Sequence, residues 1–224
     1  MTDFFEPPPL PPEDPEPLQQ PPWFGPPAGT LPGVVALELV LAQTETVAVY
    51  IARLQGYPTG FGFDLMTVAA PGQTDELDMD AALFGQRHRR GRSETLEAID
   101  PERLRLGVQF SDGAKATNVG GFHHRQDPPT GPVLHSGGGG GGGGDWHQDQ
   151  WVWPLPPPGP LSFVCEWPAA GIPLTRSEID AQNILDAAAR AQAIFPDQPA
   201  AGPSASLSHI STQPLRPKPP ADTE

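Results

Sequence analysis

Sulfur and positive charge are both scarce in this chain of 224 residues. Its single cysteine, Cys165, excludes an intrachain disulfide framework and a zinc site built from several cysteines. Lysine and arginine together number 13 against 27 acidic residues, so the net charge is -14. Because binding to a phosphate backbone or an anionic membrane needs clustered positive charge, we expect neither nucleic acid nor a membrane as a partner.

Long apolar runs are missing as well. No stretch approaches the ~18 uninterrupted apolar residues of a membrane-spanning helix. Residues 1–6 lack the basic and apolar regions of a secretory signal. We therefore expect a cytoplasmic protein, and its bias toward alanine, proline, glycine and arginine is typical of a GC-rich bacterial genome.

Proline and glycine, by contrast, are abundant, with 32 and 25 residues. Prolines are dense in residues 1–29, which are also acidic, and in residues 197–224. Segments of this kind bury too little apolar surface to offset their ordering entropy, so we expect both to be disordered tails. The sequence thus predicts one folded domain over residues 30–196.

Apolar and polar residues alternate repeatedly within that domain, which is the pattern of half-buried strands. The alternation predicts strands near residues 34–42, 46–54, 60–68, 104–110, 114–118, 132–135, 147–155 and 161–167. Asp112-Gly113 is a strong hairpin-turn signal between two of them. Residues 71–102 are polar and predict a long loop. The fold class expected is an antiparallel β-sandwich of about eight strands.

Two strands are expected to place aromatic or sulfur-bearing residues in the core. One carries Trp151 and Trp153 on a single face. The other carries Cys165 on the same face as Phe163 and Trp167, which predicts a buried and unreactive thiol.

One α-helix is predicted over residues 176–195, packed on the sheet. Thr175 and Glu178 match a capping box at its start, and Pro196 would end it. Apolar residues at helical spacing follow, and Ile184 and Leu185 are expected to be the most buried.

Eight consecutive glycines, residues 137–144, stand immediately before Asp145-Trp146. Glycine loses more entropy on ordering than any other residue, so the run predicts a mobile loop. A phosphate-binding loop needs a lysine and a following helix, and neither is present here.

The residues around this glycine loop form the candidate binding site: His135, Asp145, Trp146 and His147. The leading hypothesis is a non-enzymatic interaction module that contacts a protein partner, preferably a basic one, through the loops 71–102 and 137–150. The alternative is a small-ligand or metal-dependent site or enzyme built from those four residues. No catalytic residue, resident metal or cofactor is assigned, and the oligomeric state is left open. Convergence of His135 and His147 would favour the alternative.

Overall fold

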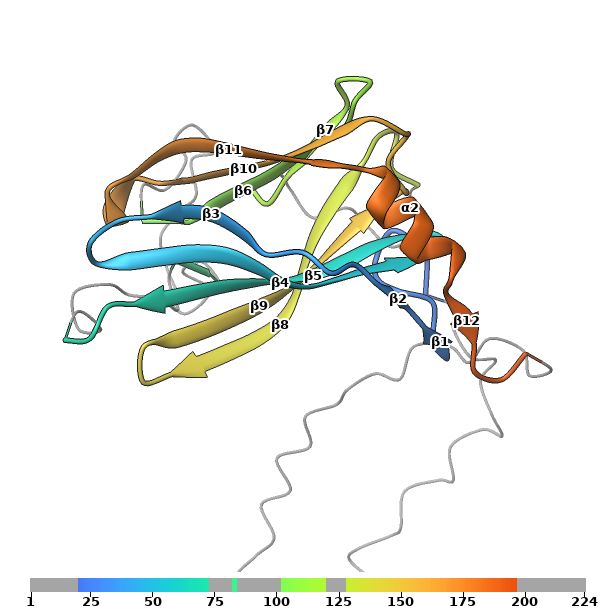
Figure 1. The fold of residues 1–224 in the computed structure, drawn as a ribbon, viewed down its shortest axis with the longest axis horizontal. Coiled ribbons are helices and arrows are strands. Elements are labelled where there is room, and N and C mark those ends of the chain that lie inside the picture. Colours follow the sequence, from blue (N-terminus) through green and yellow to red (C-terminus); the bar gives the residue numbers. More distant parts are fainter. Residues whose placement is uncertain (1–19, 73–81, 84–101, 120–127, 197–224) are drawn as a thin grey trace, which may run out of the picture.

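The computed structural model describes residues 20–72, 82–83, 102–119 and 128–196. Within these ranges the chain is mainly β, with antiparallel sheets and one α-helix (Figure 1). Residues 1–19 of the expected N-terminal tail 1–29, the expected tail 197–224 and most of the loop 71–102 lie outside the described residues. No helix in the described part is long and apolar enough to cross a membrane.

The larger sheet has six strands. Its order is β2-β4-β5-β9-β8, and β3 pairs with β4 beside β2. The strands are β2 (Gly33–Val34), β3 (Leu39–Gln43), β4 (Val47–Tyr57), β5 (Gly60–Ala69), β8 (Val133–Gly142) and β9 (Asp145–Trp153). All of these pairings are antiparallel.

A second sheet has four strands in the order β11-β10-β6-β7. They are β6 (Arg105–Gln109), β7 (Lys115–Thr117), β10 (Pro160–Trp167) and β11 (Ile172–Asp180), with the 3₁₀ turn η1 (Pro168–Ala170) between the last two. A further two-stranded pair joins β1 (Thr30–Leu31) to β12 (Gln192–Ala193). Figure 1 shows the two larger sheets one above the other, with the helix α2 (Gln182–Ala189) at one end.

The alternation read from the sequence matches the inward faces of most strands. Val49 and Ile51 of β4, and Phe61 and Leu65 of β5, are buried. The Asp-Gly turn is also confirmed. Gly113 has a positive φ of 87°, and the Ala114 amide donates to Asp112 Oδ1 at 2.9 Å.

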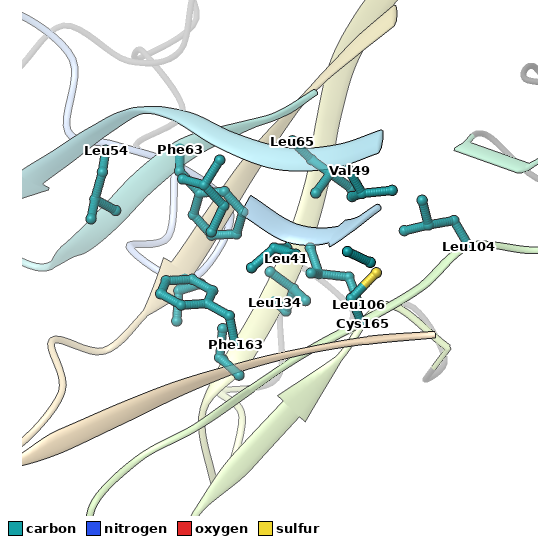
Figure 2. Close-up of a cluster of buried hydrophobic side chains, with 14 of the residues drawn as sticks. Leu41, Val49, Leu54, Phe63, Leu65, Leu104, Leu106, Leu134, Phe163 and Cys165 are labelled. Atoms are coloured by element: carbon teal, nitrogen blue, oxygen red, sulfur yellow. The ribbon is translucent and has the colours of Figure 1, made fainter. Parts of the chain in front are cut away.

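The core lies between the two larger sheets, which contribute to one cluster of buried side chains. Phe63 of β5 meets Phe163 of β10 edge to face, with ring centroids 5.4 Å apart (Figure 2). Cys165 is fully buried in this cluster, as expected. Its burial, with a smaller contribution from Glu166, raises the pKa of the thiol to about 12.

The helix predicted over residues 176–195 was wrong at both ends, since it stops at Ala189 and Gln192–Ala193 form the strand β12. Residues 172–180, including the expected capping box, form β11 instead. Thr175 lies opposite Cys165, and its hydroxyl donates to the Cys165 carbonyl at 3.1 Å. Pairing with β10 therefore overrides the local capping pattern, and the helix covers only Gln182–Ala189.

The short helix packs closely on the larger sheet because two glycines make room for it. A Cβ at Gly33 would lie 1.9 Å from the Ala187 carbonyl oxygen, and one at Gly56 would lie 2.4 Å from the Ala188 nitrogen. Ile184 is fully buried in this contact, whereas Leu185 is only partly buried. The expectation that Leu185 would be among the most buried residues is therefore wrong, since Ala187 and Ala188 are buried instead.

The glycine run is not a loop. Residues 137–142 continue β8, and Gly139 to Gly142 pair with Gln148 to Asp145 of β9. Only Gly143 and Gly144 form the turn, with φ of 66° and 109°. Two consecutive positive φ values suit the two-residue turns that match the twist of a hairpin, and glycine adopts them without strain. The partner strand supplies the backbone hydrogen bonds that the sequence alone could not show.

The two tryptophans of β9 lie on the face opposite to the one predicted. Val152 points into the core, together with Gln148 and Gln150, so Trp151 and Trp153 point outward. Trp151 is nevertheless only 4% exposed, because residues 20–27 cover that outer face. We call residues 20–27 the strap. They belong to the segment expected to be disordered, and the structure instead places them on the sheet.

Candidate functional site

The β8–β9 hairpin carries all four residues predicted for the binding site, but it spreads them out. His135 lies opposite Trp151, and His147 lies opposite Gly140. At ~3.3 Å per residue, the two histidine positions are about 13 Å apart along the hairpin. Both occupy the outer face, whereas Trp146 packs against the core.

Asp145 closes the hairpin turn opposite Gly142 and is exposed. It lies two positions from His147 on the same face of β9. Within the described ranges, no group of three or more His, Cys, Asp or Glu is placed to hold a metal ion. The structure therefore keeps His135 apart from the other three predicted residues.

The strap joins His135 to a different set of residues. Phe24 packs on the His135 ring with centroids 5.3 Å apart, and Trp23 meets Trp153 edge to face at 5.9 Å. The Trp151 indole N–H donates to the Pro22 carbonyl at 2.9 Å. These contacts hold the strap over the outer face of β8 and β9.

Trp151 fits beneath the strap because β5 carries glycines next to it. A Cβ at Gly60 would lie 2.8 Å from the Trp151 ring, and Gly62 is the direct cross-strand partner of Trp151. Tyr57 of β4 packs edge-on against the same indole at 5.4 Å. The outer face of the sheet thus has an aromatic floor that the strap partly covers.

A β-bulge in β4 supplies charge next to this floor. The register shifts between Ala52 and Gln55, so two residues of β4 oppose one of β5. The buried positions change from Ile51 to Leu54 across the bulge, and Arg53 points outward with a φ of 47°. A non-glycine residue with positive φ is uncommon, and bulges that re-aim a side chain occur often next to functional sites.

Arg53 lies between two carboxylates. Its Nε donates to Asp64 Oδ2, and its Nη2 lies 3.8 Å from Asp149 Oδ1. The hydrogen bond to Asp64 and the nearby charge of Asp149 raise the Arg53 pKa, so the guanidinium stays charged. Asp64 is mostly covered, with 12% of its side chain exposed, whereas Asp149 is 57% exposed.

A cavity of about 380 Å³ lies between the strap and the sheet. This volume falls within the range of small-molecule sites. Strap residues form one wall and the four strands β4, β5, β8 and β9 form the others. Its polar and aromatic lining includes Phe24, Arg53, Tyr57, Asp64, His135, Asp149 and Trp151. Burial raises the pKa of the Tyr57 phenol, which therefore stays a neutral hydroxyl near neutral pH.

On the inner face of the same strands, a chain of buried amides holds β8 and β9 in register. The Ser136 hydroxyl donates to Gln150 Oε1 at 3.0 Å, and Gln150 Nε2 donates to Gln148 Oε1 at 2.9 Å. Gln148 Nε2 in turn donates to the Leu83 carbonyl at 2.9 Å. Each buried amide is thus satisfied, which fixes the hairpin beneath the cavity.

The sequence pointed to His135 as a candidate site residue, but it did not point to Arg53 or Asp64, which line the same cavity. Arg53 was hidden because the alternation of β4 changes phase at the bulge. The change of phase is visible in the sequence and could have indicated the bulge, because apolar residues stand at odd positions up to Ile51 and then at the even position Leu54. Asp64 is an isolated acid within an aromatic strand, which is a second signal of a paired charge.

Comparison with known proteins does not assign this chain to a family. No family model, no curated protein and no solved structure matches the chain.

Proposed function

We propose that this protein is a non-enzymatic interaction module that binds an extended segment of a partner protein along the free edge of β8. The observation that carries this proposal is the position of that strand. β8 ends the six-stranded sheet, and within the described residues it pairs only with β9. Six of its ten residues are glycines.

An edge strand offers backbone N–H and C=O groups that a second chain can pair with. Strand addition gains its affinity from these main-chain hydrogen bonds. The glycines of β8 are mostly exposed and carry no side chain that could obstruct an approaching strand. By contrast β11, the edge of the other sheet, carries Arg176, Glu178 and Asp180, which are charges of the kind that protect edges.

The charge of the chain favours a basic partner segment. A net charge of -14 attracts lysine-rich and arginine-rich sequences at long range and repels acidic ones. The loop 71–102 would add contacts, although most of it lies outside the described residues. Cytoplasmic location, and a protein rather than a nucleic acid or a membrane as partner, belong to the same proposal.

The scaffold that presents this edge is best understood as an antiparallel β-sandwich. Eight of its strands have five or more residues, and side chains from both larger sheets share one core. Two stacked sheets make a rigid support, on which an edge strand keeps its position when a partner binds.

Lysine substitutions on β8 test strand addition. Cβ atoms at Gly140 and Gly142 would meet nothing within 4 Å, so Gly140→Lys and Gly142→Lys should fold. Gly131→Lys is the matched control, because Gly131 is equally open but lies outside the strand. Peptides selected from a displayed library against the full chain would be titrated against all three variants.

We expect the two β8 variants to weaken binding of a basic peptide about tenfold or more through like-charge repulsion, and the control to bind normally. Hydrogen exchange should show new protection of the amides in residues 137–142 when the peptide binds. A peptide that binds all variants equally and protects amides elsewhere would show that β8 is not the docking edge.

Ligand binding is the second candidate function. The four residues first predicted for it do not gather, but one of them, His135, lines the cavity beneath the strap. That cavity, and not the hairpin turn, is where a small molecule would bind.

A further inference from the structure

We propose that the cavity beneath the strap binds an organic cation, either an ammonium or a guanidinium group, through the Asp149 carboxylate and the surrounding aromatic rings. This proposal rests on the second candidate function and names the ligand class of that cavity. It is independent of the β8 edge as a docking strand.

The charges lining the cavity favour a cation. One guanidinium, from Arg53, stands against the two carboxylates of Asp64 and Asp149. Asp64 is already engaged, because it accepts the hydrogen bond from Arg53 Nε. Asp149 is not engaged in this way, since Arg53 Nη2 at 3.8 Å is beyond hydrogen-bond distance.

Asp149 is also accessible from the cavity. More than half of its side chain is exposed, and it lines the cavity on the β9 side. Gly137 of β8 keeps this wall open, because a Cβ there would lie 3.3 Å from the Asp149 Cβ. The carboxylate can therefore accept charged hydrogen bonds from a bound cation, which are stronger than neutral ones.

Aromatic rings complete the site for a cation. Phe24 of the strap, Tyr57 of β4 and Trp151 of β9 all line the cavity. Aromatic faces attract ammonium and guanidinium ions through the ring quadrupole, and quaternary ammonium ligands are commonly bound in cages of several rings. The three rings come from three separate segments, so only the folded chain brings them together.

An anionic ligand is disfavoured at the same place. Arg53 would attract an anion, but its charge is shared between Asp64 and Asp149. Any anion that reached the guanidinium would face both carboxylates at short range, in a partly covered site where charge repulsion is less screened.

Calorimetric titration of the full chain tests the proposal. Agmatine, which carries a guanidinium and an ammonium group, and choline are the cationic probes. Citrate and glycerol are the anionic and neutral controls. A blocked Gly-Arg-Gly peptide separates the two sources of such a cation. Binding of agmatine alone indicates a free small amine, and binding of the peptide as well indicates an arginine side chain of a partner.

Asp149→Asn and Asp145→Asn form a matched pair of variants. Both residues are exposed acids on the outer face of β9, and only Asp149 lines the cavity. We expect Asp149→Asn to weaken agmatine binding about tenfold or more, as for the loss of a charged hydrogen bond, and Asp145→Asn to bind like the original chain. Phe24→Leu should weaken choline binding more than it weakens agmatine binding.

Three results would overturn the proposal. The first is that neither cation binds at millimolar concentration. The second is that the two aspartate variants weaken binding equally, which would mean that the cation is attracted by the overall negative charge and not by Asp149 in the cavity. The third is that citrate or glycerol binds in place of the cations. In that last case the cavity would still bind a small molecule, so the second candidate function would stand while the proposal of a cation as its ligand would fail.

Discussion

Three adjacent glycines of β8 allow a sharp test of whether the glycine run is an ordered strand. A Cβ at Gly141 would lie 2.2 Å from the Asp145 carbonyl oxygen and 2.6 Å from the Trp146 Cα. Cβ atoms at Gly140 and Gly142 would meet nothing within 4 Å. Alanine at these three positions therefore adds the same single carbon atom to the same strand in very different surroundings.

The expected free-energy changes have opposite signs. Overpacking typically costs about 1–3 kcal/mol, and at Gly141 the clashing atoms are backbone atoms that cannot rotate away. We therefore expect Gly141→Ala to cost about 3 kcal/mol or more. Gly140→Ala and Gly142→Ala should instead stabilise the fold by ~0.4–1 kcal/mol, because alanine narrows the unfolded ensemble.

Chemical denaturation of the three variants measures these changes directly, and thermal melting provides a second measurement. For a domain of this size 1 kcal/mol corresponds to ~2–4 °C in melting temperature, so Gly141→Ala and its neighbours should differ by roughly ten degrees. If all three variants melted together, residues 137–142 would not pair with β9 in this register. The mobile loop predicted from the sequence would then be correct.

Four further predictions concern buried side chains. Ile184→Ala should cost about 2–5 kcal/mol of unfolding free energy and Leu185→Ala clearly less; equal costs by denaturation would contradict the contact between α2 and the sheet. Cys165 should resist a thiol reagent in the native protein, because its pKa of about 12 keeps it protonated, and should react once denaturant is added; rapid native labelling, read by mass spectrometry, would show an accessible thiol. Raising the pH from 9 toward 12 should lower the free energy of unfolding, because the Cys165 thiol ionises at a lower pH in the unfolded chain than in the folded one. Denaturation at several pH values measures this loss, and the Cys165→Ala variant is the control that should not show it. Trp151→Ala should cost about 3–5 kcal/mol and release the strap to proteolysis; a strap that stayed protected would be held by other contacts.

Most strands were predictable because their burial on one face leaves a period of two in the sequence. The apolar residues of β4, β5, β6 and β10 all showed it, and Cys165 was placed correctly by its neighbours. That pattern identifies two faces but not which of them is covered. In β9 both are covered, so Trp151 and Val152 are buried on opposite sides, and the sequence favoured the wrong side for the tryptophans.

Features that depend on pairing with another strand were not predictable. Thr175 and Glu178 fit a helix start, but β10 lies beside them and pairs with them. Glycine has a low intrinsic preference for strands, yet β9 provides a ladder for Gly139 to Gly142. The same holds for the candidate site, because the ion pair of Arg53 and Asp64 depends on a bulge that forms only when β4 meets β5.

The strap also has a consequence for the order in which the chain folds. The Trp151 side chain and its acceptor, the Pro22 carbonyl, are 129 positions apart. The ribosome completes the strap long before it makes β9, so the strap has no docking surface during most of synthesis. Contacts of such long sequence separation form late and slow the folding of β-rich chains. We therefore expect the cavity to appear in the last step of folding, so a cation that fills it would bind the finished fold alone and stabilise it by mass action.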